Sequence, residues 1–290
     1  MSYTLPPDAD QRPVAIIGAG TLGARIALMF SAGGSPVRII NRSHDRAAAA
    51  KRFAAEHAVQ VRAQLGLTAA RSGEIEVAGS IDDGVPGAWL VIESISEQRE
   101  LKTRMIGDLD RVADRDALLA TNSSSYPSSE LIDEARHPER ILNIHFLMPP
   151  QLNAVELMSS GKTDDGIIPA LLAKLPTYGL LPFHVLRESV GFIFNRVWAA
   201  IKRESLMALA EGVTTPAEFD RIWTATVGKP PGPFRLMDQV GLDVVLAIEE
   251  HYAQIRDGIP EAPRALLREY IDRGDLGVKS GRGFYDDYTT

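Results

Sequence analysis

The chain has 290 residues, of which 45% are apolar and 24% charged, a composition typical of folded globular proteins and not of disordered ones. A formal net charge of −7 argues against a protein that binds the phosphate backbone of nucleic acids. The absence of cysteine excludes disulfides, zinc–thiolate sites, iron–sulfur clusters and a thiol nucleophile, and it favours an intracellular location.

Neither a targeting segment nor a membrane span is expected. Residues 1–13 are polar and rich in proline, which is unlike a signal peptide or an anchor. The most apolar later stretch, 190–209, is interrupted by several charged residues, so it is too polar to cross a membrane. We expect a cytoplasmic protein that binds neither membranes nor nucleic acid and holds no metal.

The first two thirds of the chain predict strands that alternate with helices. Val14–Ile17 is a short apolar run between Pro13 and Gly18, as in a buried parallel strand. Further strands are predicted at Val37–Ile40, Ile75–Val77, Trp89–Ser94, Leu118–Thr121, Ile141–His145 and Ala154–Met158. Helices are predicted at Leu22–Ala32, Asp45–Leu65, Glu97–Val112 and Ser128–Ala135. This alternation predicts an α/β fold with a parallel, doubly wound sheet.

The pattern changes near Glu188. From Gly191 onward only helical periodicities remain, interrupted by breaks at 228–233 and 258–260 and by a glycine-rich end. We therefore expect a Rossmann-type domain over residues 1–187 and a smaller all-α domain over residues 188–290.

A glycine motif follows the first strand. Gly18-Ala19-Gly20-Thr21-Leu22-Gly23 matches G-x-G-x-x-G between a predicted strand and a predicted helix, the context that dinucleotide binding requires. Gly18 permits the tight turn, Gly20 lets the pyrophosphate approach, and Gly23 allows close packing of helix on strand. The N–H groups of Thr21, Leu22 and Gly23 at the helix N-terminus would bind phosphate. A structural glycine turn is the alternative.

The second strand ends without the acidic residue that binds the ribose 2′-hydroxyl of NAD. Asn41-Arg42-Ser43 stands there instead, and Arg42 with the Ser43 hydroxyl could bind a 2′-phosphate. We therefore favour NADP(H) over NAD(H). The alternative is that Ser43 only caps the next helix and Arg42 is solvated.

A histidine and a glutamate are placed for acid–base chemistry. His145 ends a predicted strand, and ligand crevices of doubly wound sheets lie at the carboxyl ends of strands. Pro149-Pro150 forces a turn, after which the next strand carries Glu156 back towards His145. Oxidation of a secondary alcohol needs a base near neutrality, and a carboxylate would fix the tautomer of such an imidazole. A packing histidine and an exposed strand glutamate are the structural alternatives.

Several ordered motifs resemble the 3-hydroxyacyl-CoA dehydrogenases and their lambda-crystallin-like relatives, over nearly the whole chain. They are the glycine motif, Glu93-Ser94-Ile95-Ser96-Glu97 with Lys102, Asn122-Ser123-Ser124-Ser125, His145-Phe146, Val155-Glu156-Leu157, Gly191-Phe192-Ile193-Phe194-Asn195-Arg196, Gly232-Pro233-Phe234 with Asp238 and Gly241-Leu242-Asp243, and Lys279-Ser280-Gly281-Arg282-Gly283-Phe284-Tyr285.

The resemblance implies a nicotinamide-dependent oxidoreductase of fatty acid metabolism that interconverts 3-hydroxyacyl and 3-oxoacyl substrates. It implies that His145 and Glu156 form the acid–base pair and that Ser124 and Asn195 bind the substrate oxygens. It places Glu97, Lys102 and Asn122 beside the cofactor. The alternatives are that Ser124 only belongs to a helix-capping loop, that Asn195 caps or bridges helices, and that Lys102 is solvated.

The chain departs from the family pattern at Met148, where the family has an asparagine after the catalytic histidine. The region between the helix predicted at Asp45–Leu65 and Trp89 is abbreviated, so no CoA-binding lysine can be carried across; the generic candidates are Lys51, Arg52, Arg62 and Arg71. An acyl thioester is the preferred substrate. The alternatives are a free hydroxy acid or sugar acid, and a cofactor-binding protein without catalysis.

The helical domain is short for an independent core. Phe192, Val197, Ile201, Leu206 and Leu209 form an apolar stripe that we expect to be buried against a second subunit. The family resemblance also implies a homodimer through this domain.

Overall fold

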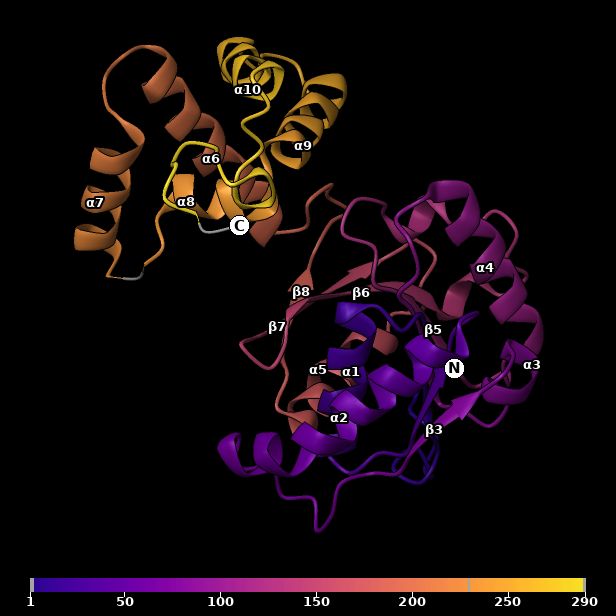
Figure 1. The fold of residues 1–290 in the computed structure, drawn as a ribbon. Helices are drawn as coiled ribbons and strands as arrows, with labels where there is room; N and C mark the ends of the chain where they lie inside the picture. The colour runs from indigo at the N-terminus through magenta and orange to yellow at the C-terminus, as the bar shows by residue number, and fades with distance from the viewer. Residues whose placement is uncertain (1–2, 229, 289–290) are drawn as a thin grey trace. The chain divides into compact units, whose positions relative to one another are not determined.

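The computed structural model describes residues 3–228 and 230–288, so that Lys229, within the predicted break at 228–233, lies outside the described residues. The chain divides into two compact units, with the boundary between Ile193 and Phe194, whereas the sequence predicts a boundary after residue 187 (Figure 1). The first unit is an α/β fold and the second is helical, as the sequence predicts.

The α/β unit contains one eight-stranded sheet. Its strands are β1 (Val14–Ile17), β2 (Val37–Ile40), β3 (Ile75–Ala78), β4 (Leu90–Glu93), β5 (Leu118–Thr121), β6 (Ile141–Met148), β7 (Leu152–Ser159) and β8 (Leu181–Val185). They lie in the order β3-β2-β1-β4-β5-β6-β7-β8. The order reverses at β1, whose neighbours are β2 and β4, and this is the point where doubly wound sheets bind ligands.

The far edge of the sheet agrees with one prediction and adds one strand. The sheet is parallel from β3 to β6, β7 returns antiparallel to β6 as the turn at Pro149-Pro150 predicts, and β8 runs parallel to β7. The strand β8 was not predicted because it is an edge strand that contains Pro182 and leaves Leu181, Phe183 and His184 exposed. Its side chains therefore lack the buried apolar pattern that identifies the other strands.

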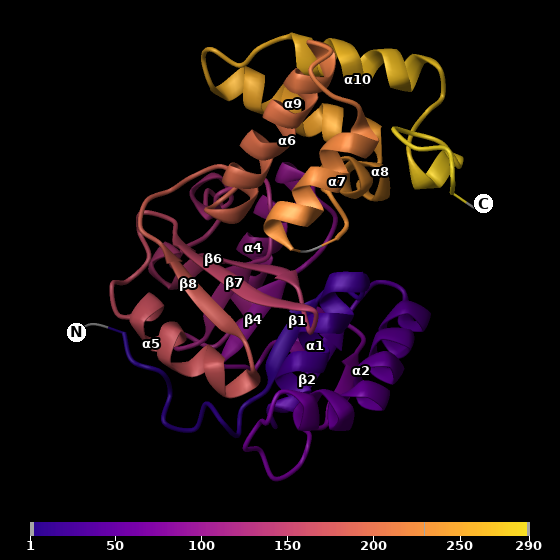
Figure 2. The same ribbon diagram turned by 90° about the vertical axis from the view of Figure 1, so that its left-hand side faces the viewer.

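Helices cover both faces of the sheet. They are α1 (Thr21–Ala32), α2 (His44–Gln64), α3 (Ile81–Gly84), α4 (Arg99–Val112) and α5 (Ile167–Lys174), with 3-10 turns at Ser128–Glu130, Pro138–Arg140 and Leu175–Tyr178. The helix α5 lies beside β8 (Figure 2). Side chains alternate between the faces: Val14 and Ile16 join the core that contains residues of α1, α2 and α5, whereas Ala15 and Ile17 join the core that contains residues of α4.

The helix predicted over Ser128–Ala135 is wrong, because only the turn Ser128–Glu130 forms. Leu131 and Ile132 are buried in the core beneath α4. The Asp110 carboxylate accepts hydrogen bonds from the backbone N–H groups of Arg136 and His137, at 2.7 and 3.1 Å. Tertiary contacts therefore override the local helix preference, which is only a weak constraint.

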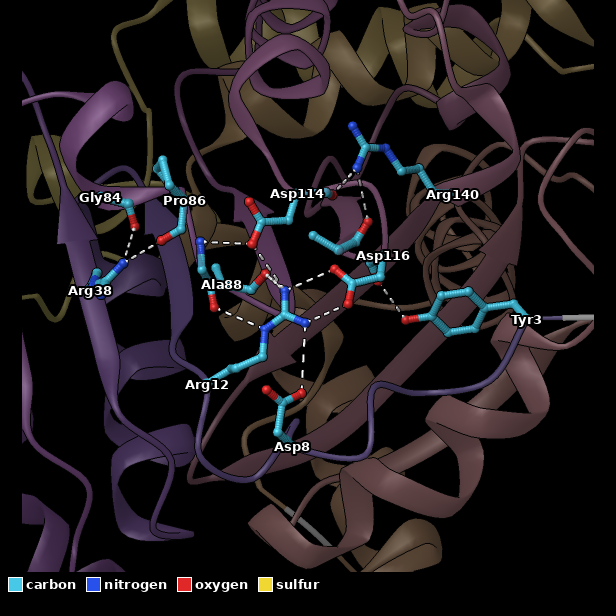
Figure 3. A network of polar contacts seen from close by, with 12 residues as sticks. Tyr3, Asp8, Arg12, Arg38, Gly84, Pro86, Ala88, Asp114, Asp116 and Arg140 are labelled. Atoms are coloured by element: carbon cyan, nitrogen blue, oxygen red, sulfur yellow. Dashed lines mark hydrogen bonds and ion pairs between the residues drawn. The ribbon is translucent and has the colours of Figure 1, made fainter.

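A polar network holds together the end of the sheet at which the parallel strands begin, opposite the glycine motif (Figure 3). Arg12, which precedes β1, donates from Nε to the carbonyl of Gly87 at 3.0 Å and from its terminal nitrogens to Ala88 and Asp116. The buried guanidinium of Arg140 bonds the Asp110 carboxylate at 2.8 Å and the carbonyl of Asp114. These bonds join the segments that lead into β1, β4, β5 and β6.

The helical unit contains α6 (Phe194–Ala210), α7 (Pro216–Val227), α8 (Pro233–Val240), α9 (Leu242–Ile255) and α10 (Ala262–Asp272), with a 3-10 turn at Val278–Ser280. Its core is formed by Leu206, Phe234, Met237, Leu242, Val245 and Leu267. Asp220 accepts hydrogen bonds from the first N–H groups of α8, those of Phe234 and Arg235, both at 2.9 Å. None of the helices described has both the length and the apolarity to cross a membrane.

Candidate active site

The glycines of the loop after β1 have distinct steric roles. Gly18 has a φ of +114°, and a Cβ on it would lie 2.3 Å from the carbonyl oxygen of Ser94 at the end of β4. A Cβ on Gly23 would lie 2.0 Å from the carbonyl oxygen of Gly18, so the start of α1 packs directly on the loop. A Cβ on Gly20, by contrast, would meet no atom within 4 Å. The space over Gly20 is therefore open for a ligand.

The N-terminus of α1 faces this loop with its N–H groups uncapped. Gly20 is the N-cap and offers no side chain, and no acidic residue lies in the first turn. The leading N–H groups of a helix have no partner within it, and the helix dipole places partial positive charge there. Thr21 and Leu22 lie in this turn, so the residues fit the diphosphate of a dinucleotide.

The end of β2 carries no carboxylate. The side-chain oxygen of Asn41 accepts a hydrogen bond from the N–H of Ala19 at 3.3 Å, which ties this strand end to the glycine loop. The Ser43 hydroxyl accepts the N–H of Arg46 at 3.4 Å and so caps α2. The side chain of Arg42 is exposed and forms no ion pair or hydrogen bond among the described residues, which leaves its guanidinium available to an anion.

Lys102 lies in the interior and not in solvent. Its Nζ lies 2.8 Å from Oε1 of Glu93, 3.1 Å from Oε2 of Glu97 and 3.3 Å from the carbonyl oxygen of Ile95. An ammonium group has three protons, and these three acceptors satisfy them. Lys102 therefore joins β4, the following loop and α4, and in this geometry it keeps no proton for a cofactor.

Glu97 connects this cluster to the loop after β5. Its Oε1 accepts hydrogen bonds from the Ser123 hydroxyl at 2.6 Å and from the N–H of Ser125 at 2.9 Å. Burial alone would raise the pKa of Glu97, but the charge of Lys102 and these hydrogen bonds outweigh burial and hold it below its usual value. Glu97 is therefore a carboxylate that fixes the Ser123–Ser125 loop.

The loop after β5 contains two side chains that are anchored and one that is free. Asn122 accepts the N–H of Phe146 on its side-chain oxygen at 2.9 Å, next to His145 on β6. Ser123 is buried, and its hydroxyl also accepts the N–H of Tyr126 at 2.9 Å. Ser124 is exposed, and its hydroxyl has no partner among the residues that the structure describes. The loop thus presents a free hydroxyl on an anchored backbone.

His145 and Glu156 lie opposite each other in the β6–β7 hairpin. Both side chains are buried, and Nδ1 of the imidazole lies 2.8 Å from Oε2 of the carboxylate. If Nδ1 carries the proton it shares with Glu156, Nε2 is left as the lone-pair nitrogen. Within the described part of the chain, Nε2 has no hydrogen-bond partner. This arrangement can accept and return a proton at Nε2.

Two neighbours of this pair were missed at the sequence level. The ring of Phe192 stacks on the imidazole, with centroids 4.7 Å apart and planes 19° from parallel. The N–H of Ile193 donates to Oε1 of Glu156 at 2.8 Å. The Gly191-Phe192-Ile193 segment lies in a motif that resembles the family, but a ring stack across the fold leaves no periodic signal in the sequence. Asn195 is the second residue of α6 in the helical unit, and its side chain is half-buried.

Two family models match the chain. The model of the 3-hydroxyacyl-CoA dehydrogenase NAD binding domain matches residues 13–188, and that of the 3-hydroxyacyl-CoA dehydrogenase C-terminal domain matches residues 191–287. Among the relatives, a probable 3-hydroxybutyryl-CoA dehydrogenase of Bacillus subtilis is 30% identical over 283 residues, which cover 95% of this chain and 97% of the relative.

A second relative matches over a shorter region. The 3-hydroxyacyl-CoA dehydrogenase-like protein LAM1 of Cochliobolus heterostrophus is 48% identical over 153 residues, which are 52% of this chain but only 32% of that protein. Solved structures agree with the fold. The (S)-3-hydroxybutyryl-CoA dehydrogenase PaaH1 from Ralstonia eutropha superposes with a TM-score of 0.84 at 30% identity, covering 97% of this chain and 100% of the other. A diketoreductase that acts on dicarbonyl compounds superposes with a TM-score of 0.77 at 26% identity, covering 95% and 98%.

Proposed function

We propose a function from the premise that this chain belongs to the 3-hydroxyacyl-CoA dehydrogenase family and is a nicotinamide-dependent oxidoreductase acting on CH–OH groups. In this proposal the protein interconverts 3-hydroxyacyl and 3-oxoacyl thioesters, with His145 and Glu156 as its acid–base pair. The observation that carries this proposal is the buried hydrogen bond between Nδ1 of His145 and Glu156.

The nicotinamide supplies or accepts the hydride when it is bound. In the direction of oxidation, Nε2 of His145 takes the proton of the substrate hydroxyl, and in reduction the imidazolium returns it. The carboxylate of Glu156, 2.8 Å from Nδ1, holds one tautomer and stabilises the charged ring. Ser124 would donate a hydrogen bond to the substrate oxygen. We assign Asn195 a second such bond, on the family pattern alone.

The decisive variant is His145→Gln. We expect kcat to fall by about 10²–10⁴, the usual contribution of general acid–base catalysis, with the dissociation constant of the cofactor within about 2-fold. His184→Gln is the matched control, because that exposed histidine lies on β8 and its side chain has no hydrogen-bond or ion-pair partner among the described residues. A loss of only a few-fold in a folded His145→Gln enzyme would remove this residue as the acid–base group.

For the cofactor we propose a preference for NADP(H). Support comes from the exposed, unpaired Arg42 at the end of β2 and from the lack of a carboxylate at that strand end. The carboxylate of Asp45, in the first turn of α2, would repel a 2′-phosphate. The segment 42–46 nevertheless has a formal charge of +1, because it contains Arg42 and Arg46 as well as Asp45.

The cofactor preference is tested by kcat/KM with NADPH and with NADH. Arg42→Ala should lower the value for NADPH by about 10–100-fold, as expected for a lost charge-assisted hydrogen bond, and leave the value for NADH unchanged. Arg52→Ala, an exposed position farther along α2, should change neither. Equal or higher efficiency of the unaltered enzyme with NADH would refute the preference.

A free hydroxy acid or a small dicarbonyl compound is the second candidate substrate. Met148 stands where the family has an asparagine, and one structural relative is a diketoreductase. Turnover of acetoacetyl-CoA, of acetoacetate and of small diketones, each with both cofactors, separates these candidates. Cofactor binding with no turnover across this panel would favour a non-catalytic protein instead.

We also propose a homodimer through the helical unit. Large apolar side chains are exposed there, including Val213 at 73%, Ile222 at 65% and Val227 at 56%. A subunit interface would bury such side chains, and the family resemblance also implies a dimer through this unit. Light scattering at micromolar concentration should give the mass of a dimer, and a monomer would contradict the proposal.

A further inference from the structure

Phe192 has a backbone conformation that its residue type rarely adopts. Its φ is +53°, and among the described residues it is the one non-glycine residue with a positive φ. Gly191, directly before it, has a φ of +78°, so the chain passes through two left-handed residues in succession. A bulky side chain is strained there, and such strain persists only where the surroundings enforce it.

The left-handed turn brings two different groups onto the His145–Glu156 pair. The Phe192 ring, 2% exposed, stacks on the imidazole at 4.7 Å, and the next backbone N–H, that of Ile193, reaches Oε1 of Glu156 at 2.8 Å. The other carboxylate oxygen, Oε2, faces Nδ1 of His145. Both members of the pair are thus held by consecutive residues of one segment.

The segment is itself anchored to the strand that carries Glu156. The N–H of Ser189 lies 3.4 Å from the sulfur of Met158 on β7, and the carbonyl of Ser189 accepts the N–H of Phe192 at 2.9 Å. Phe192 packs with Met158 and Val185 in a small buried cluster of its own. The ring therefore contacts both this cluster and the imidazole.

We propose that Phe192, together with the N–H of Ile193, is a positioning clamp for the acid–base pair. The stack fixes the plane of the imidazole about its Cβ–Cγ bond, and the N–H fixes the carboxylate, so that Nδ1 and Oε2 stay in hydrogen-bond geometry and Nε2 points in one direction. The clamp acts through His145 and does not touch the substrate. This inference rests on the proposed function, because it concerns the same pair.

The test compares Phe192→Leu with Val185→Ala. Leucine keeps an apolar side chain but removes the aromatic face, whereas Val185→Ala disturbs the same cluster without touching the imidazole. We expect Phe192→Leu to lower kcat by about 10–100-fold, with the KM and dissociation constant of the cofactor within about 2-fold. Val185→Ala should change kcat by less than about 2-fold. Phe192→Tyr keeps the aromatic ring, so its kcat should be close to that of the unaltered enzyme and well above that of Phe192→Leu.

A readout independent of turnover decides the matter even if His145 is not the catalytic base. Nitrogen-15 NMR of the imidazole distinguishes the two neutral tautomers, and unaltered protein should show His145 protonated at Nδ1 alone. Phe192→Leu should show a mixture of tautomers. Should that variant fail to fold, Phe192→Met, which is more adaptable in a packed site, takes its place.

The outcomes separate the two proposals. Loss of activity in His145→Gln, with Phe192→Leu behaving like Val185→Ala, would overturn the clamp and leave the proposed function standing. Activity retained in His145→Gln would overturn the proposed function, while the tautomer measurement would still support or refute the clamp. A single tautomer in Phe192→Leu would refute it.

Discussion

Lys102 and Glu93 form an ion pair in the interior of the α/β unit, with Nζ 2.8 Å from Oε1 and the two side chains 1% and 0% exposed. Glu93 ends β4 and also accepts hydrogen bonds from the Thr121 hydroxyl at 2.6 Å and from the N–H of Ile95 at 2.7 Å. The pair therefore joins β4, β5 and α4 at the edge of the sheet where the glycine loop lies.

Lys102→Met should destabilise the protein strongly. It would leave Glu93 buried without its counter-charge, and removal of one partner of a buried ion pair typically costs about 3–5 kcal/mol. Urea unfolding measures this cost. Arg221→Ala is the surface control, because its pair with Glu218 is 77% and 58% exposed and should contribute about 0–1 kcal/mol.

The double variant Lys102→Met with Glu93→Gln isolates the charge interaction. If the ion pair is the cause, the double variant should be more stable than Lys102→Met alone, because no unpaired charge remains. A double variant whose cost equals the sum of the two single costs would show that the pair contributes no coupling energy.

Gly18→Ala and Gly20→Ala should fail in different ways. At Gly18 the new methyl group would lie 2.3 Å from the Ser94 carbonyl oxygen on a backbone with φ of +114°, so we expect a loss of stability. At Gly20 no atom lies within 4 Å, so stability should fall by less than about 1 kcal/mol, the scale of an N-cap change.

Cofactor binding gives the second half of this prediction. The methyl group of Gly20→Ala would occupy the space open to the diphosphate, and we expect the cofactor to bind at least about 10-fold more weakly to a protein with nearly unaltered thermal unfolding. Titration of NADPH fluorescence measures this affinity. Unchanged affinity would show that the diphosphate does not approach Gly20.

The sequence predicts the central strands and the glycine loop well, because their physical signals are local. Val14–Ile17 is a continuous apolar run, and Val37–Ile40 is apolar except for Arg38, since both faces of these strands are largely covered; the structure has the same bounds. The hairpin that brings Glu156 opposite His145 was also predictable, since the turn at 149–151 leaves the next strand only one direction.

Other features depend on contacts that are distant in sequence. Helical lysines are usually solvated, and nothing local to Lys102 indicates that Glu93 and Glu97 enclose its ammonium group. The stack of Phe192 on His145 joins residues 47 positions apart through a positive φ that phenylalanine does not favour. Sequence patterns therefore predicted that His145 and Glu156 lie together but not which groups hold them.

Lys202 on α6 provides a pH-dependent prediction. It is 6% exposed and has no carboxylate within 4.0 Å among the described residues, because Glu249 is bound to Arg203 at 2.6 Å. Burial lowers the pKa of Lys202 from 10.5; the charge of Glu249 opposes this and that of Arg203 adds to it. At pH values between the lowered folded pKa and 10.5, the unfolded chain therefore binds more protons at this lysine than the folded chain does.

The free energy of unfolding should accordingly rise as pH increases towards 10.5, and this contribution is lost as pH falls through the lowered folded pKa. Lys202→Met removes the buried charge, so it should stabilise the protein at pH 7 by about 1–2 kcal/mol and flatten the alkaline rise. Urea unfolding between pH 7 and pH 10 measures both effects. Lys51→Met, at an exposed site on α2, should change stability by less than about 0.5 kcal/mol; a destabilised Lys202→Met would contradict the argument.

Arg25 joins α1, the helix after the glycine loop, to the β6–β7 hairpin. From α1 its terminal nitrogen donates to the carbonyl of Pro149 at 3.1 Å and to the side chain of Gln151 at 2.6 Å, both in the turn between β6 and β7. Arg25→Met keeps the aliphatic stem but removes both bonds. We expect a loss of stability of about 1–3 kcal/mol and a several-fold fall in kcat, since small displacements of a catalytic group are costly.

Gln151→Ala separates the two contacts of Arg25. It removes the side-chain acceptor and leaves the backbone carbonyl of Pro149, so its effect on kcat should be smaller than that of Arg25→Met. Steady-state kinetics at saturating cofactor measures this difference. If Arg25→Met turned over substrate at the unaltered rate while losing stability, Arg25 would hold the hairpin to α1 without influencing His145, and the position of the imidazole would depend on Glu156 and the Phe192 segment alone.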